Sequence, residues 1–141
     1  MTGSPTETIH ATGHENVTAE HASTLEVTSD DFLTTAGDCI LAIEADTVPA
    51  EFGEKFRTAC QRSDATITIE LEANEHTDRV EARGDPALTH ESERSGVVRT
   101  SEYVDDRTIA VDADKSARDI DRELVEALAS GAALTVTLTV E

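Results

Sequence analysis

The sequence predicts a mainly β, sandwich-like domain with two helices, built as an internal duplication whose halves are related by a pseudo-twofold axis. Two observations support this fold class. Short runs alternate apolar with polar residues, which is typical of half-buried strands, and the second half of the chain repeats the order and phase of the first. A length of 141 residues suits one domain with one core.

The duplication becomes apparent when residues 9–14 are aligned with residues 80–85, because the match then continues to the end with small gaps. The later matches keep size, polarity and phase together: residues 17–20 with 88–91, 31–33 with 102–104, and 41–46 with 109–114. We expect one domain over residues 7–141, with repeats at about residues 7–74 and 78–141. A disordered polar terminus at residues 1–6 is expected to precede it, and residues 74–78 to form a hairpin-like link.

Each half is expected to form four short strands, then one helix and a last strand. The last strands alternate most clearly, because threonine or glutamate separates Ile67, Ile69 and Leu71 in the first half and Leu134, Val136, Leu138 and Val140 in the second. The earlier strands are expected at residues 7–12, 17–21, 24–28 and 39–45, with counterparts at residues 79–83, 88–92, 97–100 and 108–113.

Apolar stripes with helical spacing locate the helices. In the first half Pro49 suits the first helical position, and the stripe that follows contains Phe52, Phe56, Ala59 and Cys60. In the second half Ser116 and Asp119 form a capping box, Gly131 ends the helix, and the stripe contains Ile120, Leu124, Ala127 and Leu128. The two helices are thus expected to be equivalent elements covering equivalent sheets.

The charge narrows the functions that we expect. The formal net charge is −19, from 30 acidic and 11 basic residues, and Lys55 and Lys115 are the only lysines. Scarce lysine beside many carboxylates is typical of proteins that work in molar salt, where the short screening length relieves repulsion. Nucleic acid and anionic membranes are not expected as partners, since like charges repel and phosphate contacts weaken steeply with salt.

Targeting signals and disulfides are not expected either. The sequence contains no long apolar run and no signal-peptide pattern, which predicts a cytoplasmic protein. Its two cysteines lack metal-type pairing and give no disulfide framework. The oligomeric state stays open.

The strongest polar constellation lies in the first half. It consists of His14, Asn16, His21, Asp38 and Cys39, and His90 of the second half shares the inward phase and could join it across the pseudo-twofold axis. The imidazoles, carboxylate and thiol of His14, His21, Asp38 and Cys39 would suit a divalent metal such as zinc. The spacing of the two histidines matches no standard zinc signature, so structural, hydrogen-bonded histidines are the alternative.

Two further groups have a functional and a structural interpretation. Cys39 could act as a nucleophile if its pKa were depressed, but Arg107 occupies the aligned position, so the position accepts unlike groups. Near the start of the second helix, Lys115 and Arg118 could hold a phosphate or carboxylate. Three aspartates in that segment oppose an anion, and a solvated network of ion pairs is the alternative.

Several short motifs, taken together, resemble one known family. They are Gly13-His14-x-Asn16-Val17, then His21, Gly37-Asp38-Cys39-Ile40, Ala113-Asp114-Lys115-x-Ala117-x-Asp119 and Arg122-Glu123-Leu124-Val125. From about residue 8 onward the chain resembles the archaeal family known as domain of unknown function 371, and its composition fits a haloarchaeal member. The resemblance implies a small cytosolic protein with a mainly β, sandwich-like fold, and it implies no activity. Asp85 and Ser92 stand where that pattern would place histidines, which argues against a site shared equally by both repeats.

The function that we expect is binding of a small ligand or a protein partner. The alternative is a metal-dependent enzyme, such as a hydrolase, that uses His14, His21, Asp38 and Cys39. The sequence contains no phosphate-binding loop, nucleotide-binding glycine motif, nucleophile-elbow serine or RNA-binding aromatic pair. Elemental analysis of untagged protein separates the two alternatives.

Overall fold

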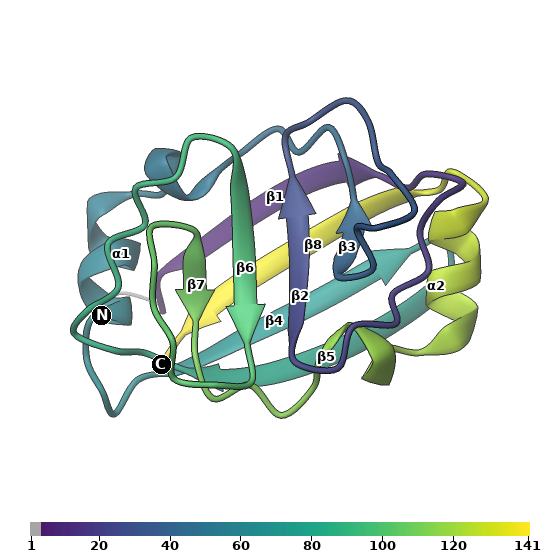
Figure 1. Ribbon diagram of the computed structural model, residues 1–141. Coiled ribbons are helices and arrows are strands. Elements are labelled where there is room, and N and C mark those ends of the chain that lie inside the picture. The colour runs from purple at the N-terminus through teal and green to yellow at the C-terminus, as the bar shows by residue number, and fades with distance from the viewer. Residues whose placement is uncertain (1–3) are drawn as a thin grey trace.

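Two four-stranded sheets face each other, and the helices lie at opposite ends of the pair (Figure 1). The computed structural model describes residues 4–141. The first sheet contains, in spatial order, β1 (Thr6–Thr12), β8 (Ala133–Val140), β4 (Thr66–Ala73) and β5 (His76–Arg83). The second sheet contains β3 (Ile40–Ala42), β2 (Thr24–Thr28), β6 (Ser95–Arg99) and β7 (Thr108–Ala110). The prediction of a mainly β fold with two helices is confirmed.

Alternating side chains create the core between the sheets. Ile67, Ile69 and Leu71 of β4 are each no more than 1% exposed, whereas Glu70 and Glu72 are exposed. The inward residues of β8 are buried in the same way. All strand neighbours in the first sheet are antiparallel. The alternation predicted from the sequence for these segments therefore places their apolar side chains in the core.

The second sheet mixes two pairing directions. Its central strands, β2 and β6, are antiparallel, while the short outer strands β3 and β7 run parallel to them. The sheets are linked at both edges by single bridges, Thr12 with Ile43 and Arg83 with Val111. Beside these bridges Asp46 and Asp114 exchange backbone and side-chain hydrogen bonds with β1 and β5.

Each predicted helix begins with a separate 3-10 turn. The turns are η1 (Pro49–Glu51) and η2 (Ala117–Asp119), and the helices are α1 (Glu54–Cys60) and α2 (Arg122–Ala129). The continuous first helix was thus wrong, because Phe52 is extended with ψ near 144° and interrupts it. Its apolar stripe is nevertheless buried at Phe52, Phe56 and Cys60.

The predicted capping box and the terminating glycine of the second helix are confirmed, but the box opens η2, and Ile120, extended with ψ near 143°, separates η2 from α2, so the continuous second helix was also wrong. The N–H and hydroxyl of Ser116 both donate to Asp119 Oδ2, at 3.0 and 3.1 Å, and Gly131 ends α2 with φ near 90°. Within residues 4–141, no helix combines the length and the apolar character that a bilayer crossing requires.

The strands expected at residues 17–21 and 88–92 are wrong, since both segments are irregular. Ala19 and His90 each have φ near 48°, in the left-handed region that a strand cannot contain. Each helix therefore follows three strands instead of four. Of the terminus predicted to be disordered, residues 1–3 lie outside the described residues, and β1 begins at Thr6.

Two glycines allow the strands to approach the helix ends closely. A Cβ atom at Gly13 would collide with the backbone carbonyl of Leu128 in α2, and one at Gly84 would collide with the carbonyls of Cys60 and Arg62 beside α1. The end of β1 thus packs against α2, and the end of β5 packs against α1, so each strand contacts the helix of the other half of the chain. These contacts fix both helices at the ends of the sheets.

Candidate functional site

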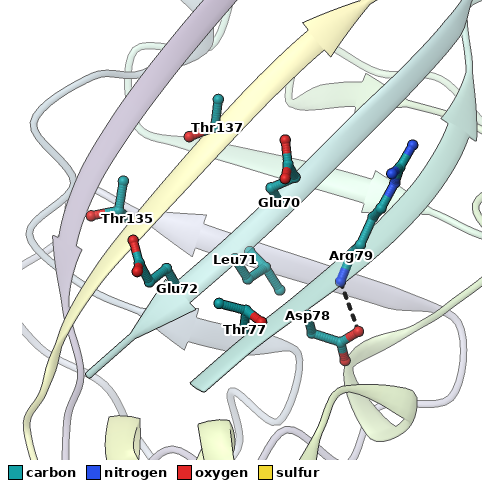
Figure 2. Close-up of a pocket in the computed structure, with 8 residues that line it drawn as sticks. All are labelled: Glu70, Leu71, Glu72, Thr77, Asp78, Arg79, Thr135 and Thr137. Atoms are coloured by element: carbon teal, nitrogen blue, oxygen red, sulfur yellow. Dashed lines mark hydrogen bonds between the residues drawn. The ribbon is translucent and has the colours of Figure 1, made fainter. Parts of the chain in front are cut away.

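The outer face of the first sheet contains a groove with a volume of about 550 Å³ (Figure 2). Three neighbouring strands, β8, β4 and β5, supply its walls. The lining residues are Glu70, Leu71, Glu72, Thr77, Asp78, Arg79, Thr135 and Thr137. Apart from the buried Leu71, their side chains are exposed or half-buried. The groove is thus an open, polar surface that neither helix covers.

Glu70 and Glu72 are the carboxylates without a partner in this groove. They stand on the same face of β4, with Thr137 and Arg79 on either side of Glu70 and with Thr135 and Thr77 on either side of Glu72. The guanidinium of Arg79 donates to Glu81 at 3.1 Å, along its own strand. Among residues 4–141, no side chain forms an ion pair with either glutamate.

Asp78, in contrast, is fully engaged. Lys115 Nζ donates to its Oδ1 at 2.5 Å, and the backbone N–H of Asp121 donates to its Oδ2 at 2.8 Å. Partial burial would raise the pKa of Asp78, but these hydrogen bonds and that from Arg79 outweigh it, and the pKa is lowered. The same contact raises the pKa of Lys115.

The residues predicted to bind an anion are each beside a carboxylate. Lys115 pairs with Asp78, while the exposed Arg118 places its Nε 4.0 Å from Asp119 Oδ1. This arrangement is the network of ion pairs that formed the structural alternative. Anion binding by Lys115 and Arg118 stays a prediction from the sequence.

His14 and His21 use their Nδ1 atoms in local turns. Nδ1 of His14 accepts from the N–H of Asn16 at 3.0 Å, and Nδ1 of His21 accepts from the N–H groups of Ser23 and Thr24 at 3.2 and 3.1 Å. An accepting Nδ1 must carry a lone pair, so the ring hydrogen of each is on Nε2. The alternating phase that His21 shares with His90 predicts that both rings point inward, and this is wrong for His21, because its ring caps a turn and is half-exposed.

The second half contains the same turns without histidine. Asp85 Oδ1 accepts from the N–H of Ala87 at 2.8 Å, and Ser92 Oγ accepts from the N–H groups of Arg94 and Ser95 at 3.1 and 3.2 Å. Aspartate and serine commonly cap turns in this way. The structure therefore gives His14 and His21 a turn-capping role.

Asn16, Asp38 and Cys39 are each held by other contacts. The Asn16 side chain donates to the carbonyl of Leu33 at 2.7 Å, and the backbone carbonyl of Asp38 accepts from the N–H of His21 at 3.3 Å. The Cys39 thiol donates to Glu26 at 3.3 Å. Burial, together with that carboxylate, raises the pKa of Cys39 to about 12, so the thiol is protonated at neutral pH and is a poor nucleophile.

No metal-ligand cluster forms in the part of the chain that the structure describes. Groups of three or more His, Cys, Asp and Glu side chains able to hold a metal ion are absent from residues 4–141. His90 packs against the rings of Phe52 and Phe56, with centroid distances of 5.6 and 6.1 Å, and these two rings also contact each other. The zinc site of His14, His21, Asp38 and Cys39 therefore rests on the sequence alone.

The fold and groove define a small two-sheet β protein with an open polar surface. The pattern of the family described as "Domain of unknown function (DUF371)" matches residues 9–141. An uncharacterized protein of Methanocaldococcus jannaschii is 39% identical over 133 residues, which cover 94% of this chain and 97% of that protein. The chain belongs to the DUF371 family.

Sequence reasoning missed the groove residues. Alternation placed Glu70, Thr135 and Thr137 between buried neighbours, which correctly assigns them to an outward face. It did not distinguish an outward face that is covered by loops from one that is open. The available signal was the pair of glutamates at Glu70 and Glu72, on a strand whose neighbour β8 presents threonines on the same face.

Proposed function

We propose that the protein is a binding domain and that the groove on the outer face of the first sheet is its binding surface. The observation that carries this proposal is the pair of unpartnered carboxylates, Glu70 and Glu72, in an open groove. Cross-strand positions next to a carboxylate usually supply a stabilising partner. Here Arg79 is directed to Glu81 instead, which leaves both groups free to contact a ligand.

We also propose that the chain is an internal duplication with repeats at about residues 7–74 and 78–141. The order of β1, β2, β3, η1, α1 and β4 recurs as β5, β6, β7, η2, α2 and β8, and both sheet orders read symmetrically about their centres. Paired contacts support it: Gly53 N–H donates to Glu7 as Asp121 N–H donates to Asp78.

The groove departs from this proposed symmetry. Because Ala65 and Ala132 accept equivalent hydrogen bonds from Gly84 and Gly13, Glu70 and Glu72 correspond to Thr137 and Thr139. Thr137 itself lines the groove directly beside Glu70, whereas Thr139 is not among the lining residues. The two carboxylates thus lie on the β4 side of the proposed twofold axis, and hydroxyl groups occupy the equivalent positions on the β8 side. A duplicated fold that carries the charge on one side of this axis only supports a binding role for the charged positions.

The proposal is tested by filling the groove. Substitutions Thr135→Tyr with Thr137→Tyr narrow it, while Thr34→Tyr with Thr35→Tyr add the same bulk to an exposed loop away from the groove. Amide NMR spectra are recorded with small-molecule and protein fractions of an archaeal cytosolic extract. Shifts at groove residues that are lost with the first pair and kept with the second support the proposal. Spectra without groove shifts, or with shifts that survive filling, contradict it.

A further inference from the structure

We propose that the groove receives an extended segment of a partner protein that has lysine or arginine at alternate positions. This inference rests on the proposed binding role of the groove and names the chemistry of its occupant. The groove lies on an uncovered sheet face, and the charges and spacing of its residues define this occupant.

The charge that is available in the groove is negative. Asp78 is neutralised by Lys115, and Arg79 is paired with Glu81. Glu70 and Glu72 remain, and both are exposed. An opposite charge in contact with them is attractive, whereas an anion is repelled both by these groups and by the net charge of −19. A second copy of this chain has the same net charge, which disfavours self-association through this face.

The geometry favours a linear occupant. Glu70 and Glu72 follow each other on one face of β4, and a strand rises about 3.3 Å per residue, so their Cα atoms are about 6.6 Å apart. Alternate side chains of an extended peptide have the same spacing. The threonines of β8 lie along one side of this row and Thr77 and Arg79 of β5 along the other, as Figure 2 shows.

The neighbouring hydroxyl groups add contacts that do not depend on charge. Thr135 and Thr137 lie directly beside Glu72 and Glu70 in the register. A threonine hydroxyl both donates and accepts, so it can bind the backbone of an extended peptide whose basic side chains contact the glutamates. Such short contacts are screened by salt less than long-range attraction is.

The probe is the capped peptide Lys-Thr-Lys-Thr-Lys, titrated into the full chain and followed by amide NMR shifts in about 0.1 M and about 2 M KCl. A peptide of the same composition with its lysines adjacent tests the spacing, and spermidine tests a free polyamine. The variant pair Glu70→Gln with Glu72→Gln removes the two groove charges. The matched control, Glu20→Gln with Glu126→Gln, removes two exposed charges elsewhere.

We expect shifts at groove residues, an apparent Kd about fivefold to tenfold weaker for the groove variant, and little change for the control. Equal weakening in both variants would identify unspecific attraction and overturn the inference. If the adjacent-lysine peptide or spermidine binds as tightly as the alternating peptide, the inference that the occupant is an extended segment is overturned. Groove binding in the extract experiment, without binding of any basic probe, would leave the proposed function intact and reject this occupant.

Discussion

His90 is a fully buried polar residue whose hydrogen bonding is incomplete. Its ring is fully enclosed, and Nε2 lies 3.1 Å from the carbonyl of Ile109. Nδ1 is the one buried side-chain nitrogen or oxygen atom in residues 4–141 that lacks a partner. Burial lowers the pKa of His90, and the nearby Arg57 lowers it further, while the hydrogen bond to Ile109 acts in the opposite direction. The ring is therefore neutral in the folded protein.

The neutral ring predicts that acid weakens the fold. An unfolded histidine binds a proton below about pH 6.5, but folded His90, whose pKa is lowered, binds one only at lower pH, so the free energy of unfolding falls as the pH drops from about 6.5. The loss is up to about 1.4 kcal/mol per pH unit. Denaturant unfolding between pH 7.5 and 5 measures it. This range lies above that in which the lowered carboxyl pKa values act.

A pair of variants isolates the contribution of His90. His90→Leu should flatten this part of the pH dependence, because no proton is then excluded from the core. His76→Gln, at a half-exposed histidine near Glu123, should keep it. An unchanged slope in His90→Leu would mean that another group controls acid sensitivity.

The two turn-capping histidines show where residue-level prediction was limited. The closeness of imidazole, carboxylate and thiol in the sequence leaves two interpretations of His14 and His21, as metal ligands or as structural, hydrogen-bonded histidines. Their aligned counterparts, Asp85 and Ser92, are among the commonest turn-capping residues. The residues aligned with the two histidines therefore indicate turns at these positions. This indication is stronger evidence than the similarity of the side chains to a set of metal ligands.

Elements with strict alternation were predicted well. β4 and β8 follow the predicted pattern closely, and β2 has the predicted bounds of 24–28. Segments 17–21 and 88–92 also alternate, but their left-handed residues, Ala19 and His90, prevent continuous pairing. The pattern of apolar and polar side chains does not reveal whether an alanine or a histidine has a positive φ. The sequence therefore predicts strands where the structure has loops.

The contact between β5 and α1 predicts a specific weakness at Gly84. Gly84→Ala places a methyl group against the carbonyls of Cys60 and Arg62, and backbone cannot move aside as a side chain can. We expect a loss of about 2 kcal/mol in the free energy of unfolding, within the usual range for overpacking. Denaturant unfolding of the variant measures the loss.

Gly53→Ala is the matched control for this prediction. A Cβ atom there would lie 3.3 Å from Glu7 Oε2, at the end of a flexible side chain. We therefore expect a smaller loss than in Gly84→Ala. Equal losses would show that glycine itself, and not the close approach to α1, determines the cost.

At the scale of the whole molecule, the net charge of −19 predicts stability that increases with salt. Repulsion among surface carboxylates opposes the compact state, and about 1 M salt reduces the screening length to roughly 3 Å. The melting temperature should rise between about 0.1 M and about 2 M KCl. A melting temperature that does not change with KCl would contradict both this expectation and the prediction from the composition that the protein works in molar salt.

The groove required the assembled molecule for its recognition. Glu70 and Thr137 come from strands about half the chain apart, and only pairing of β4 with β8 makes them neighbours. Which sheet face stays open depends on where the helices and loops settle. The sequence pattern determines inward and outward sides, but not which outward side remains accessible.

The position of β8 between β1 and β4 has a consequence for how the chain reaches this structure. β1 pairs with β8 from Thr12 with Ala133 to Thr6 with Thr139, so the paired residues are 121 (133 − 12) to 133 (139 − 6) positions apart. Contacts between such distant residues must overcome loop-closure entropy before they stabilise anything. We therefore expect the β1–β8 pairing to form late, after local units such as the β4–β5 hairpin, and folding to be slow because it is limited by the docking of β1 onto β8.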